Sequence, residues 1–246
     1  MNEFVKEGFK LIRALWYLER SGCVFCGGHP GPICPNCTRE LLHPELGRCL
    51  RCGKLIVQER TLCKDCTEGK GPKYLKKVIA WGHYTGCLKE FIQNVKFGAN
   101  PMRMMQISRP LADWAIRELP PVDGILAVPM HSTRLAERGF NQAELIASLI
   151  HWELGLPILQ GVERFKATPP QVALSRQERL QNLKNAFALR SKEPFQGRSV
   201  WLIDDVTTTG STLDAVAEVL YKGGAKEVYG LCLAAGFEKV LVPGFD

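Results

Sequence analysis

The chain lacks any long apolar run, and none of its hydrophobic stretches approaches the roughly 20 residues that a membrane-spanning helix needs. The segment from Met1 to Glu7 contains two acidic residues and no apolar core, so the pattern of a secretory signal is missing as well. No segment is of low complexity. These absences argue against a membrane or secreted protein, and we expect a cytoplasmic one.

The composition is that of an ordinary folded protein. Of 246 residues, 46% are hydrophobic and 23% are charged, which suffices for one sizeable core and a small accessory unit. The formal net charge of +7 suits an anionic partner such as a nucleic acid, although the same charge could equally serve solubility. The net charge therefore does not indicate a function until a specific binding site is located.

Cysteine is concentrated near the N-terminus. Eight of the ten cysteines form four Cys-x-x-Cys pairs, and glycines lie between several of them. Two thiolates at this spacing can face one metal ion, and two such pairs complete a tetrahedral zinc site without an open position. We expect two structural zinc ions, with sequential pairing preferred and interleaved pairing left open. The expected ligands are Cys23, Cys26, Cys34, Cys37, Cys49, Cys52, Cys63 and Cys66.

Other uses of these cysteines fit less well. A disulfide framework is unexpected in a cytoplasmic protein. Four clustered pairs without a strand–helix–strand context do not favour a redox pair, and iron–sulfur ligation suits such evenly paired cysteines poorly. Because four thiolates already complete each site, we expect His29 and His43 outside the coordination spheres. Cys87 and Cys232 stand alone and are expected in the core.

The sequence divides into three regions. Residues 1–20 place apolar side chains at helical spacing, which predicts an amphipathic helix packed on the rest of the protein. Residues 21–70 contain too few apolar side chains to fold without metal. A Gly- and Pro-containing boundary at 70–73 precedes a region, 72–246, that we expect to fold independently of the metal-binding one. The apolar positions of the N-terminal helix are Phe4, Val5, Phe9, Ile12, Leu15 and Trp16.

Strand and helix patterns alternate between residues 72 and 246. Strands are expected at 78–84, 123–128, 158–164, 186–189, 200–203 and 228–233. Helices are expected at 87–97, at 102–119 with a kink at Pro110, at 141–154 and from 213 onward. This alternation predicts an α/β fold with a parallel sheet flanked by helices.

The segment 200–212 carries the most specific chemistry. Four apolar residues predict a buried strand, two carboxylates follow, and five of the six residues from 207 to 212 are Thr or Ser. Such a turn at a helix N-terminus can hold a phosphate, while Asp204 and Asp205 can accept hydrogen bonds from ribose hydroxyls. The simpler interpretation, an ordinary connection with two surface carboxylates, leaves the hydroxyl run unexplained. The candidate residues of the turn are Thr207, Thr208, Thr209, Gly210, Ser211 and Thr212.

The pattern resembles the phosphoribosyl pyrophosphate loop of type I phosphoribosyltransferases. The loop after Val128-Pro129 is a second candidate, because ligands of open parallel sheets bind beyond the C-terminal strand ends. Arg134 and Arg138 could contact the pyrophosphate there, with Gly139 allowing close backbone approach. A solvated basic loop is the alternative, with Asn141 capping the next helix in either case.

The polar segment 164–187 is too long for an idle connection and could act as a lid, or be a solvated surface helix. Its basic residues and those of the cysteine region are candidates for nucleic-acid contact. Phe25 and Phe165 could stack on bases or pack in small cores. The basic candidates are Arg48, Arg51, Lys54, Arg164, Lys166, Arg176 and Arg179.

Several motifs together resemble the ComF family of competence proteins. The four cysteine pairs, Val-Pro-x-His, Arg-Gly-Phe-Asn-Gln and Asp-Asp-Val-Thr-Thr-Thr-Gly occur in that order, from about Cys23 to about Gly236. The resemblance implies a type I phosphoribosyltransferase fold preceded by a double zinc ribbon. It also implies a cytoplasmic role in bringing single-stranded DNA inward during natural transformation, with helicase-like or DNA-processing competence proteins as partners.

One position departs from the purine-salvage phosphoribosyltransferases, which the loop also resembles. They place an acidic residue four positions after the first Asp, where this chain has Thr208, which cannot serve as a general base at neutral pH. Two hypotheses follow. The chain is a phosphoribosyltransferase that uses Mg²⁺ with phosphoribosyl pyrophosphate and an unknown acceptor, or it is a non-catalytic module that binds single-stranded nucleic acid or a partner through the same pocket. No residue is assigned as catalytic.

Overall fold

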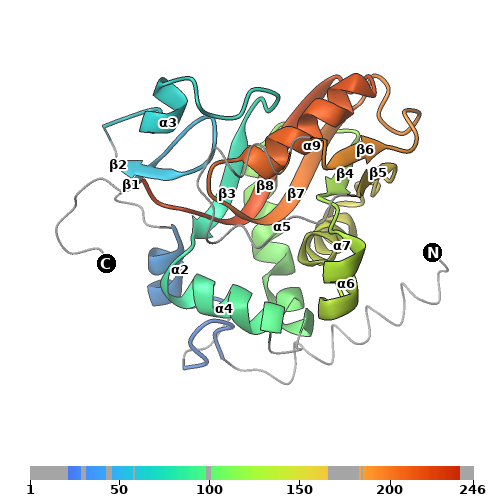
Figure 1. The fold of residues 1–246 in the computed structure, drawn as a ribbon. Helices are drawn as coiled ribbons and strands as arrows, with labels where there is room; N and C mark the ends of the chain where they lie inside the picture. Colours follow the sequence, from blue (N-terminus) through green and yellow to red (C-terminus); the bar gives the residue numbers. More distant parts are fainter. Residues whose placement is uncertain are drawn as a thin grey trace.

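The computed structural model describes residues 22–28, 32–42, 46–57, 59–97, 101–165, 183 and 185–238. Two small cysteine-containing units lie beside a larger α/β unit in Figure 1. The predicted N-terminal helix over residues 1–20 and most of the polar segment 164–187 lie outside the described residues.

A four-stranded sheet forms the centre of the α/β unit. Its strands are β3 (Val78–His83), β8 (Glu227–Ala235), β7 (Ser199–Thr207) and β4 (Gly124–Ala127), arranged in the order β3-β8-β7-β4. All three strand pairs are parallel. Every residue of β3 and β4 is buried, as expected for parallel strands that are covered on both faces.

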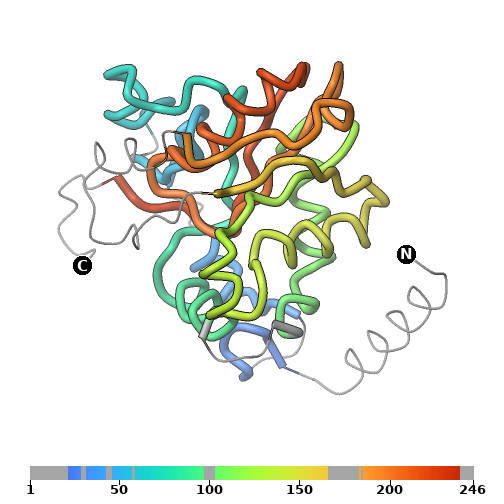
Figure 2. The backbone as a smooth tube through the Cα atoms, turned by 45° about the vertical axis from the view of Figure 1, so that its right-hand side comes forward, coloured from blue at the N-terminus to red at the C-terminus, as the bar shows by residue number. Residues whose placement is uncertain are grey.

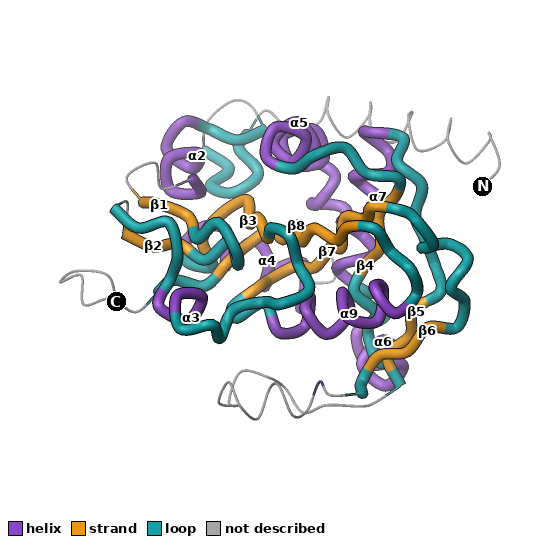
Figure 3. Tube along the Cα trace, turned by 90° about the horizontal axis from the view of Figure 1, so that it is seen from above, coloured by secondary structure: helices purple, strands orange, loops and turns teal. Residues whose placement is uncertain are grey.

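Helices cover both faces of this sheet. Figure 3 shows α5 (Ser108–Glu118) and α7 (Gln142–Leu154) on one side and α9 (Ser211–Lys222) on the other. The predicted helix over 102–119 is instead a 3₁₀ helix, η1 (Pro101–Ile107), followed directly by α5. The break falls at Ile107 rather than at Pro110. Pro110 lies in the first turn of α5, where backbone N–H groups have no intrahelical acceptor. Proline, which lacks this N–H, therefore costs the helix no hydrogen bond there.

The predicted strand over 158–164 divides into two parts. Leu159 N donates to Ile125 O (2.8 Å) and Ile125 N donates to Pro157 O (2.9 Å), so the first part runs parallel to β4 at the edge of the sheet. Gly161 then adopts a φ of 126°, which redirects the chain. Beyond it, β5 (Val162–Arg164) pairs antiparallel with β6 (Phe187–Leu189) in a separate two-stranded sheet.

The described part of the cysteine region contains two short helices and one hairpin. The first unit contributes α2 (Pro35–Leu42), and the second contributes β1 (Leu46–Arg48), β2 (Leu55–Val57) and α3 (Lys64–Thr67). Strands β1 and β2 pair antiparallel and enclose the turn that carries Cys49 and Cys52. Such small elements cannot bury a core of their own, which agrees with a need for metal.

Contacts cross the boundary expected at residues 70–73. Phe25 packs edge-on against Phe91 of α4 (Gly86–Phe97), with their ring centroids 5.3 Å apart. Arg103 donates to Val24 O (2.8 Å). In both Figure 1 and Figure 2 the chain that follows β8 reaches β2, where Glu238 N donates to Leu55 O (3.1 Å). Both cysteine units are therefore in contact with the α/β unit, and the independent folding of the two regions stays a prediction.

Among the residues described, no helix is both long and apolar enough to span a membrane.

Candidate functional site

The acidic pair lies inside the last part of β7. The predicted strand at 200–203 extends to Thr207, so Asp204 and Asp205 lie within β7, whereas the sequence pattern predicted them after the strand. Their carboxylates turn back onto the main chain, because Asp204 Oδ1 accepts from Asp205 N (2.9 Å) and Asp205 Oδ1 accepts from Val206 N (2.7 Å). The two side chains are thus fixed at the C-terminal edge of a parallel sheet, where ligands of such sheets bind.

The hydroxyl-rich turn joins β7 to the N-terminus of α9. Gly210 caps the helix with a φ of 75°, and a Cβ at this position would lie 2.6 Å from Pro72 Cγ, so the site requires glycine. Thr209 Oγ1 and Ser211 Oγ form a hydrogen bond of 2.7 Å. Thr207 Oγ1 is buried without a hydrogen-bond partner among the described residues. A buried hydroxyl without a partner is costly, and a phosphate oxygen at this turn would satisfy it.

Burial gives the acidic pair unusual electrostatics. Desolvation raises the pKa of Asp204 to about 8, and the charge of Asp205 acts in the same direction. The Lys96 ammonium opposes this rise. Lys96, near the end of α4, forms an ion pair with Asp205. No motif in the sequence marked Lys96, because the pair joins residues more than 100 positions apart.

The loop after β4 is partly helical. Residues predicted as a continuous loop form α6 (Ser132–Arg138), with His131 as its N-cap and Gly139 in the left-handed conformation (φ 81°) at its C-cap. A Cβ on Gly139 would meet no atom within 4 Å, so here the glycine is needed for its backbone conformation. The predicted cap Asn141 is confirmed, since its side chain accepts from Ala143 N (3.1 Å).

The two arginines of this loop have different surroundings. Arg138 donates to Gln142 Oε1 (2.8 Å) across the α6–α7 junction. Arg134 lies close enough to Arg164 of β5 that its positive charge lowers the pKa of Arg164, after the larger effect of burial. Asp204 acts on Arg164 in the opposite sense. Arg164 is therefore within electrostatic range of both Arg134 and Asp204, whereas the sequence suggested it only for nucleic-acid contact.

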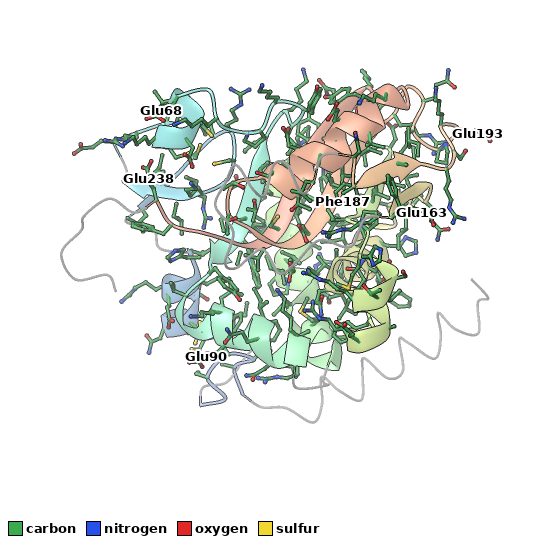
Figure 4. All side chains as sticks on the ribbon, in the orientation of Figure 1. Glu68, Glu90, Glu163, Phe187, Glu193 and Glu238 are labelled. Atoms are coloured by element: carbon green, nitrogen blue, oxygen red, sulfur yellow. The ribbon has the colours of Figure 1, made fainter. Side chains whose placement is uncertain are left out.

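The hairpin β5–β6 fixes Arg164 in this position. Its guanidinium lies over the ring of Phe187, labelled in Figure 4, with 5.5 Å between Cζ and the ring centroid. The following residue, Phe165, is 59% exposed, and its carbonyl lies 3.2 Å from His131 Nε2. The Phe165 carbonyl, at the end of β5, thus lies near the N-cap residue of α6.

The eight paired cysteines converge in two groups of four. Cys23, Cys26, Cys34 and Cys37 form one group, and Cys49, Cys52, Cys63 and Cys66 form the other. Within each group the sulfur atoms all lie within 4.8 Å of one another. Sequential pairing is therefore confirmed over the interleaved arrangement, and all of these cysteines are free thiols.

The donor sets fit zinc. In the second group a hydrogen bond from Cys52, opposed by burial, lowers the pKa of Cys49 to about 4, while burial raises the pKa of Cys66 to about 12. Four sulfurs this close cannot all ionise without a compensating charge, which a divalent cation would supply by binding all four as thiolates. Cys232 is fully buried in β8, as expected. Cys87 is only half-buried and packs against the first group, contrary to the core position expected.

The remaining basic candidates of the cysteine region are engaged within the protein. Arg48 donates to three main-chain carbonyls, among them Ala80 O (2.6 Å). Arg51 Nε donates to Pro72 O (2.7 Å), and Lys54 pairs with Asp65 at 2.8 Å. Phe25 packs on Phe91, so it is not available for base stacking. Lys166, Arg176 and Arg179 lie outside the described residues.

Comparisons with known proteins agree with this geometry. A family model described as phosphoribosyl transferase domain matches residues 102–244. Competence protein F of Haemophilus influenzae is 35% identical over 229 residues, which cover 86% of this chain and 96% of that protein. DNA utilization protein YhgH of Escherichia coli is 33% identical over 84% of this chain and 91% of its own length. Competence protein ComFC of Streptococcus pneumoniae is 27% identical over 80% of this chain and 84% of its own.

Proposed function

This chain belongs to the competence protein F family and carries a phosphoribosyl transferase domain, and from this premise we propose that it binds phosphoribosyl pyrophosphate or a related phosphorylated ribose while handling single-stranded DNA. The observation that carries the proposal is an acidic pair followed directly by a hydroxyl-rich helix N-terminus at the C-terminal end of a parallel sheet, with Arg164 within electrostatic range of Asp204. A role on incoming DNA places the chain in the cytoplasm, where helicase-like or DNA-processing proteins are its expected partners.

Each part of the ligand has a matching group. The turn from Thr207 to Thr212 binds the 5′-phosphate, since it offers hydroxyls and the N–H groups of a helix N-terminus. Asp204 and Asp205 accept the ribose hydroxyls. Arg134 and Arg164 face the pyrophosphate, and guanidinium groups suit such oxygens. Arg138 and Gly139 are second candidates for this contact. Magnesium bound to the pyrophosphate and ribose oxygens would supply further charge neutralisation.

Pentosyl transfer is the reaction that this ligand permits. The bond between the anomeric carbon and a pyrophosphate oxygen breaks, pyrophosphate leaves, and a new bond forms to a nucleophile on the acceptor. Positive charge that develops on the ribose would be stabilised by the carboxylate of Asp205, since Asp204 retains its proton at neutral pH. Thr208 cannot accept a proton from the acceptor, so the acceptor must lose its proton elsewhere.

Pyrophosphate release tests this activity. The protein is incubated with Mg²⁺, phosphoribosyl pyrophosphate and candidate bases or single-stranded DNA, and the reaction is compared with that of the Asp204→Asn/Asp205→Asn variant. Release by the wild type above the variant supports transfer. The absence of any difference would rule it out and leave the binding function alone.

The second candidate function is a non-catalytic module that binds single-stranded nucleic acid through the same pocket. The exposed ring of Phe165, the residue that follows Arg164 in the sequence, favours it, because aromatic rings stack on bases and arginines bind phosphates. We expect the affinity for a labelled oligothymidylate to fall at least tenfold between about 50 and 200 mM salt. Phe165→Ala should weaken binding about tenfold at fixed salt. Fluorescence anisotropy measures both, and an affinity that does not change with salt contradicts DNA binding.

The two cysteine groups are proposed as structural zinc sites. Four thiolates leave no open coordination position, so these sites serve folding and not chemistry. Their position against the α/β unit, described above, gives them a direct influence on the rest of the fold.

Stability should depend on pH through Asp204. Its folded-state pKa of about 8 exceeds the ordinary value of 3.8, so the folded protein retains a proton that the unfolded chain releases. The stabilisation from burying neutral Asp204 is complete below about pH 4 and is lost as the pH rises to about 8, a change on the order of a few kcal/mol. Urea denaturation of wild type and Asp204→Asn between pH 5 and 8.5 measures this. A constant difference between them would contradict the assignment.

A further inference from the structure

One helix connects the first cysteine group to the acidic pair. Lys96, in the last turn of α4, pairs with Asp205, and the side chains of both residues are largely buried, at 16% and 17% exposure. The pair lies at the proposed ribose site, yet Lys96 precedes the region 102–244 that the phosphoribosyl transferase model matches. The α/β unit thus obtains a site residue from a segment outside that match.

The ion pair with Lys96 fixes the position of the Asp205 carboxylate. A buried lysine is costly unless its charge is compensated, so its ammonium stays on Asp205 as long as α4 holds it there. Asp205 accepts Val206 N on its other side, so the carboxylate is held from two directions. Asp204 is the titratable neighbour of both members of the pair, and the buried thiol of Cys232 lies near both aspartates. Arg164 acts on Asp204 from β5.

The helix itself is rigidly seated. Its apolar side chains Leu88, Phe91, Ile92 and Val95 are each 2% exposed or less, at helical spacing. About 15 Å separates Gly86 from Lys96 along the axis. A helix packed in this way moves as a unit, so a shift at its first turn is carried to its last.

The first turn of α4 is fastened to the first cysteine group. Glu40 of α2 accepts from Cys87 N (2.9 Å), which satisfies one of the free N–H groups of that turn. Gly86 adopts a φ of 46°, and a Cβ there would overlap Glu40 Oε1. The side chain of Cys87 packs against the group formed by Cys23, Cys34 and Cys37. In Figure 1, α4 runs from the side of α2 toward α6 and α7.

We propose that Lys96 is a positioning residue of the phosphoribosyl site and that α4, anchored at Glu40, makes the affinity of this site depend on the first cysteine group. The proposal rests on the proposed function, because it concerns the binding of the same ligand. The first cysteine group, which contributes no atom to the pocket, would then influence the affinity for the ligand through α4.

The end of α4 that carries Lys96 is tested with Lys96→Met and Lys96→Arg. The control is Lys89→Met, since Lys89 is an exposed lysine of the same helix. Isothermal titration with phosphoribosyl pyrophosphate and Mg²⁺ gives Kd, and urea denaturation gives stability. We expect Kd to rise at least tenfold for Lys96→Met and to stay within about threefold of wild type for Lys96→Arg, which keeps the charge, and for Lys89→Met. If Lys96→Met reduces folding yield, Lys96→Gln replaces it.

The contact between α2 and the first turn of α4 is tested with Glu40→Ala. The control is Arg39→Ala, since Arg39 is an exposed neighbour of Glu40 on α2. Glu40→Ala should raise Kd threefold or more, although Glu40 touches neither the ligand nor Asp205, while Arg39→Ala should not. Equal Kd values for Lys96→Met and Lys89→Met would overturn the positioning role. Equal values for Glu40→Ala and Arg39→Ala would overturn the coupling. If the wild type itself does not bind, the proposed function fails, and that outcome is separate from both of these.

Discussion

Replacing Cys34 and Cys37 with serine is expected to abolish zinc binding at the first cysteine group and to remove on the order of 10 kcal/mol of its folding free energy. The loss should spread to the α/β unit, because Phe25, Glu40 and Cys87 fasten this group to α4. We therefore expect weaker binding of phosphoribosyl pyrophosphate, by at least tenfold in the protein that remains folded. Zinc content, circular dichroism and isothermal titration measure the three effects.

Arg39→Ala, on the same helix as Cys37, is the matched control and should retain zinc, fold and affinity. A variant that loses zinc and the structure of residues 21–70 but binds the ligand with unchanged affinity would contradict this expectation. It would show that the two regions fold independently, as the composition around residues 70–73 suggested.

Replacing both Asp204 and Asp205 with asparagine is expected to lower the affinity for phosphoribosyl pyrophosphate by at least about 100-fold. A hydrogen bond to a charged acceptor such as Asp205 contributes about 1.5–3 kcal/mol and one to a neutral acceptor such as Asp204 about 0.5–1.5 kcal/mol. The variant weakens both and leaves Lys96 without a partner carboxylate. Asparagine keeps the size of aspartate, and urea denaturation checks that the fold persists although Lys96 loses its partner carboxylate. Titration calorimetry in the presence of Mg²⁺ gives the affinity.

Asp113→Asn provides the matched control, since Asp113 is an acid on α5 that pairs with Arg109 at 3.0 Å. This control should bind as the wild type does. Equal affinities for the acidic-pair variant and the control would exclude Asp204 and Asp205 from the ligand site.

Local patterns predicted the elements of the α/β unit well. The apolar runs at 78–84 and 200–203 are strands, and the helix over 141–154 begins at its predicted cap, Asn141. The cysteine spacing also sufficed to predict two four-cysteine groups. These features depend on residues that are close in sequence.

Features that depend on distant contacts were not predicted. The run at 158–164 reads as one strand, and only the turn at Gly161 and the pairing with β6 divide it. The basic loop predicted after β4 contains the helix α6, which His131 caps at its N-terminus and Gly139 at its C-terminus. Its 7 residues are too few to show a helical period in the sequence. Lys96 and Arg164 reach the acidic pair through tertiary packing, which no local spacing records.

A crystal structure of the protein soaked with phosphoribosyl pyrophosphate and Mg²⁺ tests the location of the ligand most directly. We predict density for the 5′-phosphate against the turn from Thr207 to Thr212, for the ribose hydroxyls at Asp204 and Asp205, and for the pyrophosphate toward Arg134 and Arg164. Density at another place on the protein, or an unchanged turn at saturating ligand, would contradict the assignment of this sheet edge as a phosphoribosyl site.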